Sequence, residues 1–205
     1  RVSRGLGDVY KRQMMAYPFD GYWKDVGTID SLWEANMDLL GKEPAFQLRG
    51  DKRSTIYARN SAMPSSYIDE QAEIVNAFVA EGSEVYGEVY NSVIGCGVTI
   101  GKGTVIRDSI IMNQTQIGEG CEINKAIIAE NVVVGNQVKL GVGEEAENDT
   151  APHIYNHGLV TIGEKSVIPD GISVGKNSVI SGVTAAADYE DSQLASGKTL
   201  IKAGE

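Results

Sequence analysis

An aliphatic residue recurs at nearly every sixth position along much of this chain, and this period restricts the fold more than any other feature. The recurrence runs from Ile94 to Leu140, resumes at Ile162 and continues to Ile180. No amphipathic helix repeats every six residues, and a simple strand repeats every two. Short parallel strands wound into a three-sided coil, with about 18 residues per turn, do have this period. The period therefore predicts a parallel β-helix.

The recurring aliphatic residues are predicted to point into the coil, where each contributes about 1.5–3 kcal/mol of burial free energy. Small residues four places later, such as Thr104, Cys121 and Ser178, are predicted to face inward as well. Glycines after many of the aliphatic residues suit the sharp corners between faces. The predicted inward aliphatic positions are Ile94, Ile100, Ile106, Met112, Ile117, Ile123, Ala129, Val134, Leu140, Ile162, Ile168, Val174 and Ile180.

The chain has two cysteines, which are too few for a disulfide framework or a zinc site. Cys121 falls at an inward place and Cys96 at an outward one, so we expect two reduced thiols. Residues 141–158 interrupt the period and predict a loop that leaves the coil.

The formal net charge of −10 argues against a nucleic-acid partner. No apolar run approaches the roughly 18 residues of a membrane span, and the first residues carry no apolar core of the signal-peptide kind, so we expect a cytoplasmic protein without a membrane partner. Residues 1–13 are basic against an acidic remainder and have no period, which indicates a foreign or disordered segment. Residues 43–71 are expected to connect to a coil at 72–205.

Residues 28–41 carry the signals of one short helix. Thr28 is a suitable N-cap, Asp30 lies in the first turn, and Gly41 can end the helix. Asp25 lies just before it, at an expected junction of strand and turn. An acid there suits Mg²⁺, but Mg²⁺ usually needs another carboxylate and substrate phosphates, and a turn or capping role is the alternative. The expected packing face holds Ile29, Leu32, Trp33, Met37 and Leu40.

Four stretches carry a resemblance to a known family: YPFDGYWKDVGTIDSLWEANMDLL, TIYARNSAMPSSYI, NSVIGCGVTIGKGTVIRDSIIM and IPDGISVGKN. They resemble the C-terminal part of bacterial glucose-1-phosphate adenylyltransferase (ADP-glucose pyrophosphorylase), over essentially all of Met14 to Glu205. The resemblance implies an all-β, left-handed parallel β-helix of hexapeptide repeats at 72–205. At 14–42 it implies the C-terminal end of an α/β nucleotidyltransferase domain, left as a short helical remnant.

The family joins ATP and glucose 1-phosphate into ADP-glucose and pyrophosphate in glycogen synthesis. Asp25 matches one of its two aspartates that bind the catalytic Mg²⁺. The family's glycine-rich nucleotide loop, the partner aspartate and the lysine that grips glucose 1-phosphate have no counterpart here. We therefore expect a C-terminal fragment that is inactive alone and serves assembly and allosteric regulation, in a homo-oligomer such as a homotetramer or with a paralogous subunit.

Other functions fit parts of the same pattern. Hexapeptide acyltransferases share the β-helix and use a histidine as general base. His153 and His157, the two histidines of the chain, lie in the expected loop, although solvated loop residues are the simpler interpretation. A non-catalytic regulatory paralogue and a purely structural oligomerisation module are the remaining alternatives.

Overall fold

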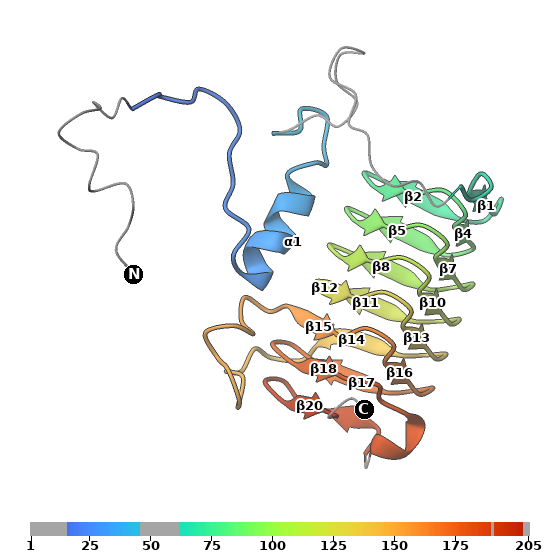
Figure 1. Cartoon of the computed structure of the whole chain (residues 1–205). Coiled ribbons are helices and arrows are strands. Elements are labelled where there is room, and N and C mark those ends of the chain that lie inside the picture. Colours follow the sequence, from blue (N-terminus) through green and yellow to red (C-terminus); the bar gives the residue numbers. More distant parts are fainter. Residues whose placement is uncertain (1–15, 46–61, 190, 203–205) are drawn as a thin grey trace.

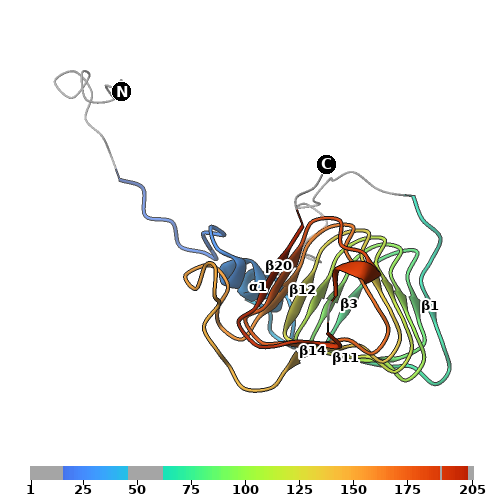
Figure 2. The same cartoon turned by 90° about the horizontal axis from the view of Figure 1, so that it is seen from below.

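The computed structural model describes residues 16–45, 62–189 and 191–202. Its main body is a parallel β-helix of about eight turns, which confirms the predicted fold. Seen along its axis the coil has a triangular cross-section, and helix α1 (Ile29–Met37) lies outside one face (Figure 2). The predicted foreign segment, 1–13, lies outside the described residues, as does part of the predicted connection.

Each face of the prism is one parallel sheet, to which successive turns of the coil add strands (Figure 1). Sheet A contains β1 (Tyr67–Ile68), β4 (Glu84–Val85), β7 (Thr99–Ile100), β10 (Gln116–Ile117), β13 (Val133–Val134) and β16 (Val167–Ile168). Sheet B contains β2 (Glu73–Val75), β5 (Glu88–Tyr90), β8 (Val105–Arg107), β11 (Glu122–Asn124), β14 (Lys139–Val142), β17 (Ser173–Gly175) and β19 (Gln193–Leu194). Sheet C contains β3 (Phe78–Val79), β6 (Val93–Ile94), β9 (Ile110–Ile111), β12 (Ala126–Ile128), β15 (Val160–Ile162), β18 (Val179–Ser181) and β20 (Thr199–Ile201).

Equivalent residues of neighbouring turns pair directly, and their spacing gives the length of a turn. Ile100 pairs with Ile117, and Ile117 with Val134, so a regular turn takes 17 residues. An earlier turn is shorter, because Val85 pairs with Ile100, 15 residues on. Strand β1 already pairs with β4, so the coil includes residues from the stretch 43–71.

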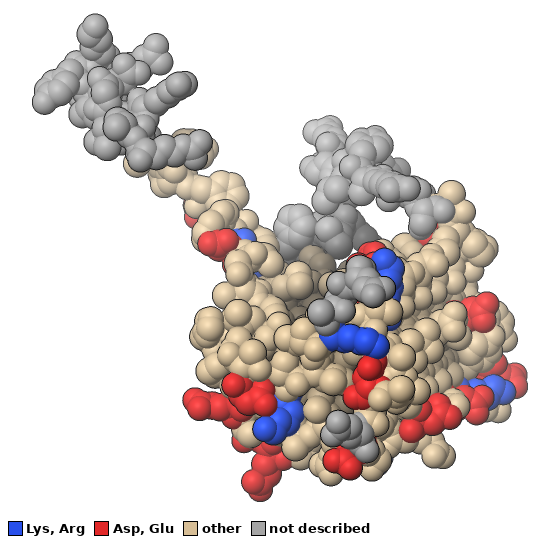
Figure 3. Space-filling view, turned by 60° about the horizontal axis from the view of Figure 1, so that its bottom comes forward, with Lys and Arg blue, Asp and Glu red and all other residues tan. Residues whose placement is uncertain are grey.

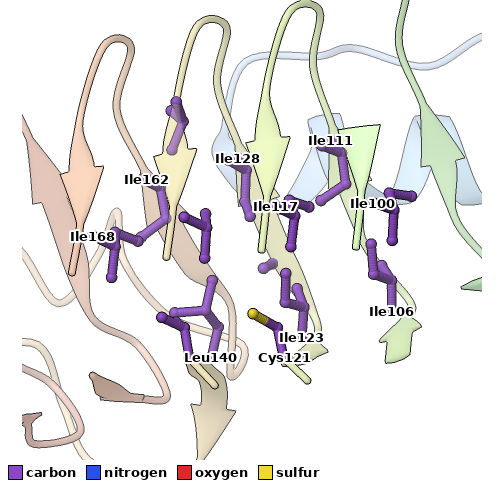
Figure 4. Close-up of a cluster of buried hydrophobic side chains, with 14 of the residues drawn as sticks. Ile100, Ile106, Ile111, Ile117, Cys121, Ile123, Ile128, Leu140, Ile162 and Ile168 are labelled. Carbon is purple, nitrogen blue, oxygen red and sulfur yellow. The ribbon is translucent and has the colours of Figure 1, made fainter. Parts of the chain in front are cut away.

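The inward residues of the three sheets stack into one continuous core (Figure 4). Thr104, Cys121 and Ser178 have no exposed surface, which confirms the predicted inward small residues. Both cysteines are free thiols, with Cys96 partly exposed and Cys121 buried, again as predicted.

Two predicted inward positions are wrong. Met112 and Ala129 are only partly buried, and the residues before them, Ile111 and Ile128, fill the core. One step of the repeat takes five residues rather than six. It runs from Ile106 in sheet B to Ile111 in sheet C, whereas the predicted positions placed it between Met112 and Ile117. Adjacent aliphatic residues in sheet C hid the phase of the repeat, because either one could have pointed inward.

Sheet C is apolar on its outer surface as well. Ile110 and Ile127 point away from the core, yet only 4% of each is exposed. On sheet A the corresponding outward residues include Gln116 and Val133, and 42% of Val133 is exposed. An outer surface that is buried indicates that something packs on it, and this is where α1 lies.

The predicted loop leaves the coil after β14 and returns at β15, so the prediction for 141–158 is confirmed apart from its first residues. Asn148, at 3% exposure, anchors it by donating from Nδ2 to the carbonyl of Asn177 at 3.0 Å. The loop extends beside α1 (orange in Figures 1 and 2).

The last turn is closed by a short 3-10 helix, η2 (Ala186–Asp188), and by Tyr189, which packs against the end of the core. Lys202 Nζ pairs with Asp188 Oδ2 at 2.9 Å. With this end of the coil forward, Figure 3 shows basic side chains lying next to acidic ones on the visible face. In the described residues, no helix has the length and apolar character to cross a membrane.

Candidate functional site

Asp25 lies in an exposed, extended segment that runs back along α1. The strand that the sequence predicted just before Asp25 does not form. Its neighbour Lys24 donates from Nζ to Asp38 Oδ2 at 2.9 Å and pairs with Glu34 Oε2 at 3.1 Å. The Tyr22 hydroxyl donates to the same Asp38 oxygen at 2.9 Å. The hydrogen bond from Lys24 holds the pKa of the Asp38 carboxyl below its usual range. The residues before Asp25 are thus tied to the C-terminal end of α1.

The residues after Asp25 are tied to the other end of the helix. Thr28 is the N-cap, as predicted: its Oγ1 accepts from the Ser31 amide, and its own amide donates to Ser31 Oγ at 3.0 Å. Asp30 occupies the first turn, where a hydrogen bond from Thr28 lowers the pKa of its carboxyl. The helix ends at Met37, four residues before Gly41, which has a φ of +99°. Asp25 therefore lies in a short connection held at both of its ends.

The described residues do not complete a magnesium site. Nowhere in 16–45, 62–189 or 191–202 do three or more His, Cys, Asp or Glu side chains gather where they could hold a metal ion. Asp25 itself offers one exposed carboxylate. Mg²⁺ sites of transferases use one or two carboxylates together with substrate phosphates. The described residues therefore supply one candidate ligand and not a complete metal site.

Helix α1 docks on the outer surface of sheet C through three of the five residues predicted for its packing face. Ile29, Trp33 and Met37 pack against a cluster of buried residues of the coil, which confirms the predicted packing face for these three residues. None of the helix residues is fully buried, because solvent reaches the opposite side. The cluster on the coil consists of Ile110, Ile127 and Leu159, with Met112 partly buried beside it.

Trp33 is the residue through which α1 makes its most specific contact with the coil. Its indole Nε1 donates to the backbone carbonyl of Asp108 at 2.7 Å. The Lys125 ammonium lies over the ring, 5.3 Å from its centre, at cation–π distance. Asp108 and Lys125 are the corner residues between sheets B and C in successive turns, and the sequence analysis missed both.

The loop that follows β14 forms the other boundary of the docked helix. His153 and His157 are both exposed, and His157 Nε2 lies 3.9 Å from Asp30 Oδ2 on α1. Between the loop and the segment that follows Asp25 lies a mainly apolar cleft of about 510 Å³. Its lining residues are Val26, Gly27, Thr28, Ile29, Leu32, His153 and Ile154. The loop histidines thus face the helix rather than an enclosed site.

Two sequence families match different parts of this architecture. The family described as nucleotidyl transferase matches residues 8–42, which include Asp25 and α1. The family described as GlmU-like, C-terminal hexapeptide matches residues 62–162, and its repeats fit a left-handed β-helix. The helix and the coil thus correspond to two families that meet in one chain.

Curated relatives cover both parts together. A glucose-1-phosphate adenylyltransferase of Lachnospira eligens is 53% identical over 194 residues, which are 95% of this chain and 46% of that protein. The enzyme of the same name from Acetivibrio thermocellus is 44% identical over 194 residues, again 95% of this chain and 45% of the relative. One from Thermotoga maritima is 44% identical over 200 residues, 98% of this chain and 46% of the relative. The chain thus spans about half the length of the curated relatives it matches.

Proposed function

Because this chain is homologous to the C-terminal part of the glucose-1-phosphate adenylyltransferases, we propose that it is part of an enzyme that makes ADP-glucose and pyrophosphate from ATP and glucose 1-phosphate. The observation that carries the proposal is the 53% identity that extends over both α1 and the coil. We further propose that the enzyme acts in cytoplasmic glycogen synthesis. In this proposal residues 14–42 close the nucleotidyltransferase domain, and the β-helix serves assembly and allosteric regulation.

Asp25 is proposed as one of the Mg²⁺ ligands of the complete enzyme. A bound Mg²⁺ would neutralise phosphate charge during displacement at the α-phosphorus of ATP. The contribution of this chain is to present the Asp25 carboxylate in fixed geometry, since Lys24 and Thr28 bind both ends of the helix that follows. Fixed placement of reacting groups supplies much of the rate enhancement in reactions of this kind.

We expect the isolated chain to release no pyrophosphate from ATP and glucose 1-phosphate with Mg²⁺. One carboxylate holds a metal–triphosphate complex poorly, and the described residues form no cluster of three or more His, Cys, Asp or Glu side chains that could hold the metal. The test is a coupled pyrophosphate assay on the purified chain, alone and mixed with the N-terminal half of the Lachnospira eligens enzyme. The matched variant is Asp25→Asn, which keeps the size of the side chain and removes its charge.

Turnover that returns in the mixture and is lost with Asp25→Asn would support both the reaction and the role of Asp25. Turnover that returns and is unaffected by Asp25→Asn would reject the metal-ligand role. Turnover by the chain alone that Asp25→Asn abolishes would contradict the expected inactivity. The acyltransferase alternative requires acetyl-CoA dependence, which can be measured on the same preparation; the exposed positions of His153 and His157 give it no support.

A further inference from the structure

One row of corner residues in the β-helix does more than turn the chain. At the corner between sheets B and C, Asn76, Asn91, Asp108 and Lys125 occupy successive turns with φ of 52°, 46°, 49° and 49°. Asn and Asp tolerate this left-handed conformation better than most residues, and glycine tolerates it best. The left-handed conformation therefore favours Asn and Asp at these corners, but it does not require their side chains to contact one another.

The side chains of the first three corners are hydrogen-bonded to one another, and we call them the corner ladder. Asn76 donates from Nδ2 to Asn91 Oδ1 at 2.7 Å. Asn91 in turn donates from its own Nδ2 to the carboxylate of Asp108. The bonds run parallel to the coil axis, so that each turn orients the polar group of the next one.

The corner ladder meets the α1 region at both of its ends, and between them Asn91 Nδ2 makes a weak contact with Met37 Sδ of the helix at 4.0 Å. At one end, the Asp108 carbonyl accepts the indole N–H of Trp33 at 2.7 Å, in the middle of the helix. At the other end, Asn76 Oδ1 accepts from the backbone amide of Gly41 at 2.6 Å, just beyond the helix. Two contacts at different points along one short rod fix its direction as well as its position.

The apolar contact under α1 cannot fix that direction by itself. Burial of Ile29, Trp33 and Met37 on sheet C is favourable in many orientations, because apolar attraction is non-directional. Hydrogen bonds require a defined distance and angle. We propose that the corner ladder is a positioning device that sets the orientation of α1 on the β-helix, with Trp33 and Gly41 as the contact points at its two ends.

The consequence for Asp25 rests on the proposed function. Lys24 binds Asp38 and Glu34 beyond and within α1, and Thr28 caps its first turn, so the connection that carries Asp25 moves with the helix. A helix held by the ladder therefore holds Asp25 in a defined place relative to the coil. In this way the β-helix acts on the proposed metal ligand through Asn91, Asp108 and Trp33, although none of these residues is a neighbour of Asp25 in the sequence.

The test measures amide hydrogen exchange of α1 in the full chain. Asn91→Gly keeps the left-handed corner accessible and removes both side-chain bonds of the ladder, together with the weak contact of Asn91 with Met37. Trp33→Phe keeps an aromatic ring on sheet C and removes the indole donor. The control is Asn131→Gly, the same substitution at a left-handed corner (φ of 58°) that is exposed. For each ladder variant we expect about tenfold faster exchange in α1, which corresponds to about 1.4 kcal/mol at 25 °C.

We expect the melting temperature of the coil to stay unchanged in Trp33→Phe and in the control. Asp108→Asn keeps an acceptor for Asn91 and is expected to exchange like the unsubstituted chain. If α1 exchange does not change in either ladder variant, or rises equally in the control, the positioning role is wrong. If Asn91→Gly unfolds the coil, Trp33→Phe decides, because Trp33 lies outside it. The exchange result is independent of turnover, so the pyrophosphate assay can fail without deciding this proposal.

Discussion

At the scale of single residues, the direction in which a side chain points decides what it contributes. Along strand β10, Ile117 points into the prism with 3% of its surface exposed, while its neighbour Gln116 points to solvent. The two residues are adjacent in the same strand and differ in the burial of their side chains. Substitutions at these neighbours therefore separate the contribution of the core from that of the strand.

We expect Ile117→Ala to lower the free energy of unfolding of the coil by about 2–5 kcal/mol, through lost burial and the cavity left behind. Urea denaturation followed by circular dichroism measures the loss. The control, Gln116→Ala, removes side-chain atoms from the same strand on its exposed face and should change stability by less than about 0.5 kcal/mol. Similar losses for the two variants would contradict the register of β10.

The two thiols should differ sharply in reactivity. Cys121 is fully buried, and its burial raises the pKa of the thiol, which keeps it protonated and unreactive near neutral pH. Cys96 is partly exposed. We expect iodoacetamide at pH 8 to label Cys96 in the native chain and Cys121 only after denaturation, as measured by peptide mass spectrometry. The Cys96→Ser variant should take up no label while folded; native labelling of Cys121 would contradict its inward place.

At the scale of elements, the strands of sheets A and B were easier to predict than those of sheet C. Strands such as Gln116–Ile117 and Glu122–Asn124 alternate polar and apolar residues, so the inward one is evident. In sheet C, Ile110–Ile111 and Ala126–Ile128 are apolar on both surfaces, which left the phase open and moved the predicted core to Met112 and Ala129. The same double apolarity marks the face on which another element packs.

That face provides an element-scale prediction. Ile127→Asn places an amide on the outer surface of sheet C beneath α1 without entering the prism, so we expect the helix to undock while the coil stays folded. In a Trp23→Phe background, the fluorescence of Trp33 should shift to longer wavelength, with little change in circular dichroism. The control is Val133→Asn, an outward residue of sheet A with 42% exposure, which should leave the fluorescence unchanged. An unshifted spectrum in Ile127→Asn would contradict the docking of α1 on this face.

At the scale of the whole molecule, the sequence predicted the local features of the candidate site but not the contacts between residues that are far apart in the chain. Local signals were enough for Thr28 and the helix, because caps and helical spacing depend on neighbours in the chain. The corner ladder joins residues 15 and 17 positions apart, Asn76 to Asn91 and Asn91 to Asp108. Its detection requires the length of each turn, and that length is set by pairing between strands. A regular spacing of Asn and Asp at the turn length is the signal that could have found it.

The helix and the coil should also separate in their stability. Helix α1 has nine residues and none of them is fully buried, whereas many core residues of the coil have no exposed surface. Isolated helices of this length are marginal in water, so α1 depends on its contacts with sheet C and the corner ladder. We expect urea to remove these contacts first. The midpoint from Trp33 fluorescence, in the Trp23→Phe background, should lie below the midpoint from circular dichroism of the strands.

The coil is expected to stay folded when α1 is lost. Its turns support one another through nearest-neighbour pairing, so loss of a helix from one face should leave the strand ladders intact. The Trp33→Phe variant lacks the fluorescent residue, but the Asn91→Gly variant keeps it. Asn91→Gly should lower the midpoint from Trp33 fluorescence further than the midpoint from circular dichroism. Coincident midpoints in the Trp23→Phe chain would show that helix and coil unfold as one cooperative unit. In that case the docking of α1 would contribute to the stability of the whole molecule rather than only to the placement of Asp25.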